Sequence, residues 1–194
     1  MNGVVFGDLD GIQFNGGGTL VVENSVIAGF IEAGIGHFAA GSNLIVNNCE
    51  FRNNGGNGVR TVTASDTNSN AVIENSRFEY NATGVRAVGG TANISIRNSV
   101  LANNNVGVFA FSQSPTQPVL IVVDTCTIAH NTTGTGANTG AAGSATIRVT
   151  NSTIYHNVNG IVVGGAGAVE SYGNNRVTAN TSGSTFSGTV LPLQ

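Results

Sequence analysis

The stretch NSVLANNNVGV, residues 98–108, contains the pattern that decides the fold. Asn98 is followed three residues later by an aliphatic residue, six residues later by a second Asn, and nine residues later by Gly107-Val108. The first part of this pattern recurs along the chain at intervals of 23–27 residues. Its copies are NSVIAGF at Asn24, NCEFRNN at Asn48, NSRFEYN at Asn75, NSVLANN at Asn98, TCTIAHN at Thr125, NSTIYHN at Asn151 and NNRVTAN at Asn174. Self-similarity at a period of this length indicates a repeat protein.

Each repeat contains short β-strands joined by tight turns. The residues before an anchor Asn alternate between apolar and polar, as in Ile94-Ser95-Ile96-Arg97, and a period of two is typical of a strand. A Gly followed by one residue, usually apolar, comes nine or ten residues after most anchors. These pairs begin at Gly34, Gly58, Gly84, Gly107, Gly134, Gly160 and Gly183. Equivalent positions in successive coils stack about 4.8 Å apart, so like residues form rows along the axis.

These observations predict an all-β fold, a single-stranded parallel β-helix of about seven to eight coils with about 25 residues each. We expect one domain over residues 1–194, with an incomplete first coil over 1–23, seven repeat coils over 24–184 and a C-terminal tail or cap over 185–194. Because the chain opens within the pattern, we expect either a missing upstream segment or an introduced start at Met1. The first residues lack the basic and apolar regions of a signal peptide.

The motif N-S-x-[ILF]-x-x-N-x-x-G-[VI] resembles the repeats of right-handed parallel β-helix proteins of the pectin-lyase-like superfamily, of bacterial type, over essentially the full chain. The usual handedness of parallel crossover connections also favours a right-handed helix. The strict hexapeptide period of left-handed β-helices is absent from the sequence. The resemblance implies polysaccharide as a possible partner and, for catalytic members, lyase or hydrolase activity. The motif is specific for the fold and not for an activity.

The composition limits the partners that this chain can have. Charged residues make up 9% of the chain, Lys is absent, and the net charge is −3. Binding of nucleic acid needs a clustered basic face, and the seven arginines are scattered, so we expect no nucleic-acid partner. No apolar run approaches the roughly 18 residues of a membrane helix, so we expect no membrane span. The resemblance and the Asn, Thr and Ser content predict an extracellular or cell-surface location.

Two rows of Asn are expected to be structural, because Asn tolerates the left-handed conformation at a tight corner and its stacked side chains can hydrogen-bond along the axis. The first row contains the anchors. The second lies six places on, with Phe30 as the exception, and contains Asn54, Asn81, Asn104, Asn131, Asn157 and Asn180. Opposite charges at equal positions of adjacent coils, Glu50 with Arg77 and Arg52 with Glu79, are expected to pair on a solvated face.

Three acidic residues near the start of the chain are the candidates for catalysis. Asp8 and Asp10 lie two apart on a predicted strand and point the same way, and Glu32 follows in the next coil. An inverting glycosidase needs two carboxylates about 6.5–9.5 Å apart, which this spacing can supply. The same carboxylates are the candidates for a Ca²⁺ site, and no other cofactor is predicted. The alternative is that a turn before Gly11 favours Asp here for structural reasons.

Two histidines on adjacent coils, His130 and His156, have no evident third ligand, so we predict a solvent-facing corner there and no metal site. No Ser–His–Asp or Cys–His arrangement can be assembled from the sequence.

One group of outward-facing residues is not explained by the repeat alone. Arg60, Arg86, Phe109 and Phe111 follow the inward row of the Gly-apolar pairs, and we predict that they bind an acidic sugar through charge and stacking. A second outward row, three residues before the anchors, is apolar and predicts association with another copy of the chain, with packing beneath variable loops or a missing N-terminal segment as the alternative. It contains Val21, Ile45, Val72 and Val122 and is broken by Ser95.

Two functions follow from these features. The favoured one is a non-catalytic surface or secreted β-helix module that is structural or binds glycans weakly along one face. The alternative, which the resemblance allows, is a polysaccharide lyase or glycoside hydrolase. It predicts that Asp8, Asp10 or Glu32 lines a cleft with Arg60 or Arg86 nearby. Whether the chain is an enzyme stays open at this point.

Overall fold

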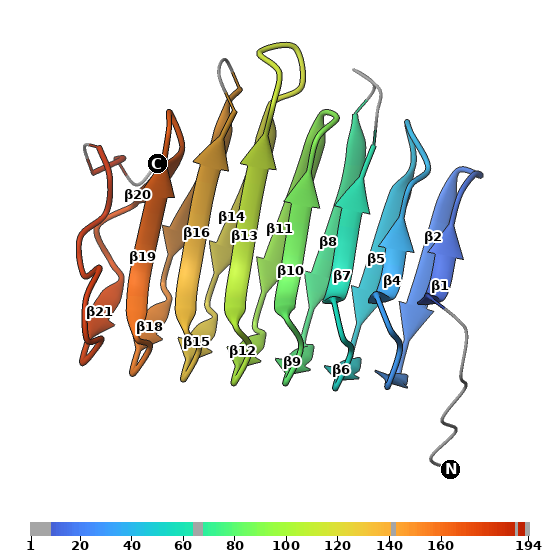
Figure 1. Ribbon diagram of the computed structural model, residues 1–194, viewed down its shortest axis with the longest axis horizontal. Helices are drawn as coiled ribbons and strands as arrows, with labels where there is room; N and C mark the ends of the chain where they lie inside the picture. The colour runs from blue at the N-terminus through green and yellow to red at the C-terminus, as the bar shows by residue number, and fades with distance from the viewer. Residues whose placement is uncertain (1–8, 64–67, 141–142, 189, 193–194) are drawn as a thin grey trace.

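The protein is a right-handed parallel β-helix, seen in a computed structural model that describes residues 9–63, 68–140, 143–188 and 190–192 (Figure 1). All regular secondary structure in the described part of the chain is β-strand. Successive coils lie side by side from the N-terminal to the C-terminal end. The predicted all-β class and architecture are therefore confirmed.

Three parallel sheets, which we call A, B and C, run the length of the helix with seven strands each. Sheet A contains β1 (Asp10–Phe14), β4 (Ala33–His37), β7 (Asn57–Val62), β10 (Thr83–Val88), β13 (Val106–Ser112), β16 (Thr133–Thr139) and β19 (Asn159–Gly164). Sheet B contains β2 (Thr19–Glu23), β5 (Asn43–Asn47), β8 (Ser69–Glu74), β11 (Ala92–Arg97), β14 (Val119–Asp124), β17 (Ala145–Thr150) and β20 (Ala168–Ser171).

Sheet C is formed by the three-residue strands that follow the anchor residues. It contains β3 (Val26–Ala28), β6 (Glu50–Arg52), β9 (Arg77–Glu79), β12 (Val100–Ala102), β15 (Thr127–Ala129), β18 (Thr153–Tyr155) and β21 (Arg176–Thr178). The number of turns is slightly lower than the predicted seven to eight. The last Gly pair, at Gly183, forms no strand, and the neighbouring Ser182 makes only an isolated bridge to Asn159.

The core is a set of identical positions stacked coil on coil. Phe51 and Phe78 are fully buried and their rings stack with centroids 4.8 Å apart. Leu101 and Ile128 occupy the same row in the next two coils and are also fully buried. This row is continuous because the strands pair in register, so that each side chain contacts its counterparts above and below.

The left-handed corner residues are only partly those that the sequence predicts. Five anchor Asn residues and Thr125 have positive φ and are exposed, as expected. At the second corner, however, the left-handed residue is the one before the predicted Asn, such as Asn103 at φ 56° and His130 at φ 57°. The second Asn row lies inside the corner and is buried over Asn54–Asn157.

This buried row forms a hydrogen-bonded ladder. The Nδ2 of each Asn donates to the Oδ1 of the Asn in the next coil, over 2.9 Å from Asn54 to Asn81 and 3.1 Å from Asn81 to Asn104. The same pattern continues to Asn131, Asn157 and Asn180. Each Oδ1 also accepts the backbone N–H of the Asn before it, so the amides satisfy the polar groups that the corner would otherwise bury.

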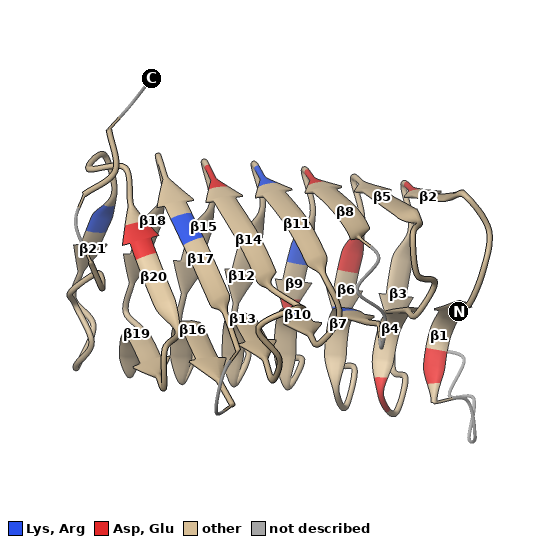
Figure 2. Cartoon of the chain, turned by 90° about the horizontal axis from the view of Figure 1, so that it is seen from above, with Lys and Arg blue, Asp and Glu red and all other residues tan. Residues whose placement is uncertain are grey.

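Cross-coil ion pairs form in the row just before the anchors, where Arg97 pairs with Glu74 and Asp124, but not among the described charged residues of sheet C. The strand register does place Glu50 beside Arg77 and Arg52 beside Glu79. The ion pairs nevertheless form within each strand, from Arg52 to Glu50 at 2.8 Å and from Arg77 to Glu79 at 2.9 Å. Alternate residues of a strand point to one face, so these side chains meet without crossing coils. Figure 2 shows that charged positions are sparse among the tan strands.

His37 is a buried polar residue of sheet A whose ring nitrogens are both occupied. Its Nε2 lies 2.7 Å from the Ser42 hydroxyl, its Nδ1 lies 3.4 Å from the Thr61 hydroxyl, and its ring stacks on Phe14. Because Ser42 donates its own proton to the Ala39 carbonyl, it accepts from Nε2–H, which fixes the neutral tautomer. Burial lowers the pKa of His37 below its usual value of 6.5.

We expect the stability of the protein to fall as the pH drops below about 6.5. The unfolded chain then protonates His37, whereas the folded chain keeps it neutral, so the unfolded state binds more protons and its free energy falls relative to that of the folded state. Midpoints of thermal unfolding measured between about pH 7 and pH 5 test this. The variant His37→Gln should lose part of the dependence, and an unchanged profile in that variant would contradict the assignment.

Candidate functional site

The outer face of sheet A carries the predicted arginine and phenylalanine side chains in one row. Arg60, Arg86 and Phe109 are partners in register on β7, β10 and β13, and all are half-buried. Phe111 lies two residues beyond Phe109, and the two rings are near-parallel with centroids 6.5 Å apart. The structure thus brings all four predicted ligand-binding residues onto one continuous surface.

The predicted acidic residues lie at the N-terminal end of this row. The Asp10 side chain is only 1% exposed, and its Oδ1 accepts the backbone N–H of Ala33 at 2.9 Å. The Nη2 of Arg60 lies 3.5 Å from Asp10 and 2.8 Å from Glu32, so one guanidinium holds both carboxylates. Asp8 lies outside the described residues. Arg60 therefore gives both carboxylates an ion-pair partner, while the Glu32 side chain stays 41% exposed.

Arg86 resembles Arg60, one coil away, whose guanidinium lies over the Phe38 ring and whose Nε is also buried without a hydrogen-bond partner, but it differs in its charge partners. Its guanidinium lies over the Phe109 ring, 5.6 Å from the centroid, and its Nε is buried without a hydrogen-bond partner. Among the described residues it has no carboxylate within ion-pair distance. Burial and the charge of Arg60 both lower the pKa of Arg86. An anion beside the exposed part of the guanidinium would relieve this repulsion and accept hydrogen bonds from it.

A hollow adjoins Phe109 on the side away from Arg86. It has a volume of about 150 Å³ and exists because Gly136 follows Phe109 in the row and has no side chain to fill the space. Phe109, Asn138 and Val162 are among the side chains around it. Arg86, the Phe109 ring and this hollow together form a surface with a cation, an aromatic ring and a concave neighbour.

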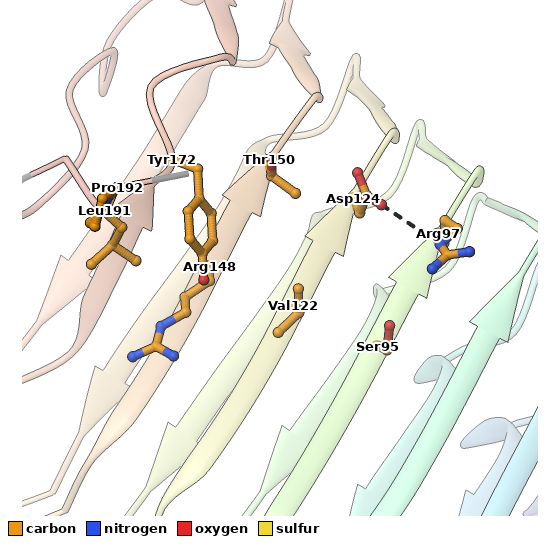
Figure 3. Close-up of a pocket in the computed structure, with 9 residues that line it drawn as sticks. All are labelled: Ser95, Arg97, Val122, Asp124, Arg148, Thr150, Tyr172, Leu191 and Pro192. Carbon is orange, nitrogen blue, oxygen red and sulfur yellow. Dashed lines mark ion pairs between the residues drawn. The ribbon is translucent and has the colours of Figure 1, made fainter. Parts of the chain in front are cut away.

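Sequence reasoning missed a second concave region, on the outer face of sheet B. A pocket of about 550 Å³ is lined by side chains of β11, β14 and β17 and by the C-terminal segment (Figure 3). Ser95, which breaks the outward apolar row, lies at the N-terminal end of this pocket. That break was the available signal, since a small residue between Val72 and Val122 leaves a depression.

The histidine corner is exposed, as predicted. His130 and His156 lie on adjacent coils with ring centroids 5.4 Å apart, and the Tyr155 ring packs against both. Over the described ranges, no group of three or more His, Cys, Asp or Glu side chains is arranged to hold a metal ion. Over the same ranges, no helix is long and apolar enough to cross a membrane.

Comparison with known protein families agrees with the geometry. Residues 2–119, more than half of the chain, match the family model described as the right-handed β-helix region. The chain therefore belongs to the right-handed β-helix family. Searches of curated proteins and of solved structures gave no match.

Proposed function

We propose that the chain is a non-catalytic β-helix module of a secreted or cell-surface protein, and that it binds acidic glycans on the outer face of sheet A. The observation that carries the proposal is Arg86, a half-buried cation over an aromatic ring with no carboxylate partner among the described residues. Similarity of the repeat to pectin-lyase-like proteins supports a polysaccharide as the ligand.

The arrangement suits a sugar carboxylate. A guanidinium presents several N–H donors to a carboxylate, and such charge-assisted bonds are stronger than neutral ones. The neighbouring Phe109 ring and the hollow at Gly136 offer an apolar surface for the ring of the same sugar. Arg60 is already neutralised by Asp10 and Glu32, so Arg86 supplies the free positive charge of this surface.

Replacing Arg86 with Gln is expected to weaken the binding of a galacturonate trisaccharide at least about tenfold. The variant keeps a polar side chain of similar length and loses only the charge and part of the donor set. Calorimetric titration at about 50 mM and about 500 mM salt measures the effect, and the wild-type affinity should fall with salt because the contact is partly exposed.

The matched control is Arg176→Gln, which removes an exposed arginine of β21 on sheet C and should leave binding unchanged. Equal affinity of the wild type and Arg86→Gln would contradict the proposal, as would equal affinity for a neutral galactose trisaccharide. Turnover of polygalacturonate or alginate that is lost in Asp10→Asn would instead support the lyase or hydrolase alternative. Fractionation of native cells tests the proposed location, and a cytosolic result would contradict it.

Association with a second copy also stays a prediction. Val21 and Val72 of the outward row on sheet B are 52% and 39% exposed, so part of this row is open to solvent. A mass measurement in solution tests it, and a strict monomer would rule it out.

A further inference from the structure

The pocket on the outer face of sheet B is lined by three residues in register. Ser95, Val122 and Arg148 are neighbours on β11, β14 and β17, and all three side chains point outward. Figure 3 shows Tyr172 and Arg148 at one end, Ser95 and Arg97 on the strand at the other end, and Val122 with Asp124 on the strand between them. With a volume of about 550 Å³, the pocket falls in the size range of small-molecule sites.

The charges around this pocket are already balanced. The Nε of Arg148 donates to Glu170 at 2.9 Å, and this bond raises the pKa of Arg148, with a smaller contribution from Tyr172. Arg97 lies between Glu74, at 3.8 Å, and Asp124, at 3.6 Å. An anionic ligand would compete with these carboxylates, whereas a neutral ligand would leave the pairs intact. Each guanidinium has five N–H groups, so both still have donors for a neutral ligand.

The lining also has an apolar surface and additional polar groups. The ring of Tyr172 and the side chain of Val122 provide the apolar part, and the hydroxyl of Thr150 lies at the edge. An apolar surface beside paired donors and acceptors matches a ring that has one apolar face and hydroxyl groups at its edge. Arg148 is held in place by Glu170, so little conformational freedom is lost when a ligand binds.

The pocket continues towards the N-terminal end. A second hollow of about 250 Å³ shares Ser95 and Val122 with it and extends to Val72 on β8. The two hollows therefore form one elongated groove across four coils, which we call the Ser95 groove. Coils are about 4.8 Å apart, so this groove has room for a chain of rings rather than for a single one.

We propose that the Ser95 groove binds a neutral oligosaccharide, with one ring against Tyr172 and Val122 and its hydroxyls bonded to Arg148, Arg97 and Asp124. This site lies on a different sheet from Arg86 and does not depend on the acidic-glycan proposal. The module would then bind acidic glycans on the outer face of sheet A and neutral oligosaccharides on the outer face of sheet B.

A panel of neutral trisaccharides, α- and β-linked, of glucose, galactose and mannose, tests the site by NMR titration of the methyl signals of Val122 and Leu191. At least one sugar should shift these signals in the wild type. Tyr172→Ala should weaken that binding at least about tenfold, and Ser95→Phe, which fills the point shared by the two hollows, should abolish it. Tyr80→Ala is the matched control, because it removes an exposed ring from a corner outside the groove.

Unfolding midpoints of the three variants establish that each is folded. The proposal is overturned if no sugar of the panel shifts the signals, or if Tyr172→Ala and Ser95→Phe bind as well as the wild type. It is also overturned if these signals shift with the protein concentration, which would indicate a second copy of the chain, and not with the sugar concentration. The acidic-glycan proposal is tested separately by Arg86→Gln. This variant should bind neutral sugars in the Ser95 groove as well as the wild type does.

Discussion

Replacing Asn104 with alanine is expected to lower the free energy of unfolding by about 3–4 kcal/mol. The side chain donates to the carbonyls of Phe78 and Ala102, both at 3.0 Å, and to Oδ1 of Asn131 at 3.2 Å. Its own Oδ1 accepts the backbone and side-chain N–H groups of Asn81. The substitution removes all of these bonds and leaves the buried backbone N–H of Asn81 without its side-chain acceptor, and an orphaned buried group costs about 1–3 kcal/mol. Urea denaturation measures the loss.

The adjacent Asn103 is the control for this prediction. It is exposed, has φ 56° and makes none of the ladder bonds. Because Gly adopts a positive φ without a steric cost, Asn103→Gly should change the stability by less than about 1 kcal/mol. Similar losses of unfolding free energy for Asn103→Gly and Asn104→Ala would mean that the ladder stabilises the fold no more than an exposed corner residue does.

A methyl group at Gly107 is expected to destabilise the protein by about 3 kcal/mol. A Cβ placed there would lie 2.6 Å from the carbonyl oxygen of Gly134 and 3.0 Å from a methyl carbon of Ile128. The obstacle is backbone of the next coil, which cannot move without breaking the pairing of β13 with β16. Gly34, Gly58, Gly84 and Gly134 meet the next glycine in the same way, so the effect belongs to the repeat.

The control is Gly18→Ala, in the exposed turn before β2. A Cβ at Gly18 meets no atom within 4 Å, and the residue does not have a positive φ. The expected change is within about 0.5 kcal/mol. Thermal or urea unfolding of Gly107→Ala and Gly18→Ala compares the two, and equal stabilities would show that the coils can separate to admit the methyl group.

The fold is predictable from the sequence because one coil repeats. A regular period places like residues in register, and the inward positions of Phe51, Phe78 and Leu101 follow directly from it. The position of the left-handed residue within the second corner does not follow, because Asn suits both the corner and the buried ladder beside it. Only the backbone geometry shows that Asn103 turns the chain and Asn104 bonds along it.

The candidate site is predictable in part, for a similar reason. Period-two alternation is enough to place Arg60, Arg86 and Phe109 in one outward row. It does not say which arginine has a partner, because long side chains reach residues of other coils, as Arg60 reaches Asp10. The Ser95 groove depends on volumes summed over several coils and on the C-terminal segment, and a single repeat contains neither. The function itself stays a proposal that these binding experiments decide.

The buried ladder has a consequence for how the molecule opens. Every hydrogen bond between side-chain amides in this ladder runs in the same direction, from one coil to the next, so neighbouring hydrogen bonds polarise each other. The chain then behaves as a one-dimensional lattice in which each site is coupled to its two neighbours only. In such a lattice an internal defect interrupts two couplings and a terminal one interrupts a single coupling. The free energy needed to separate coils is therefore smallest at the two ends of the ladder, and the middle coils around Asn104 are the last to lose their order.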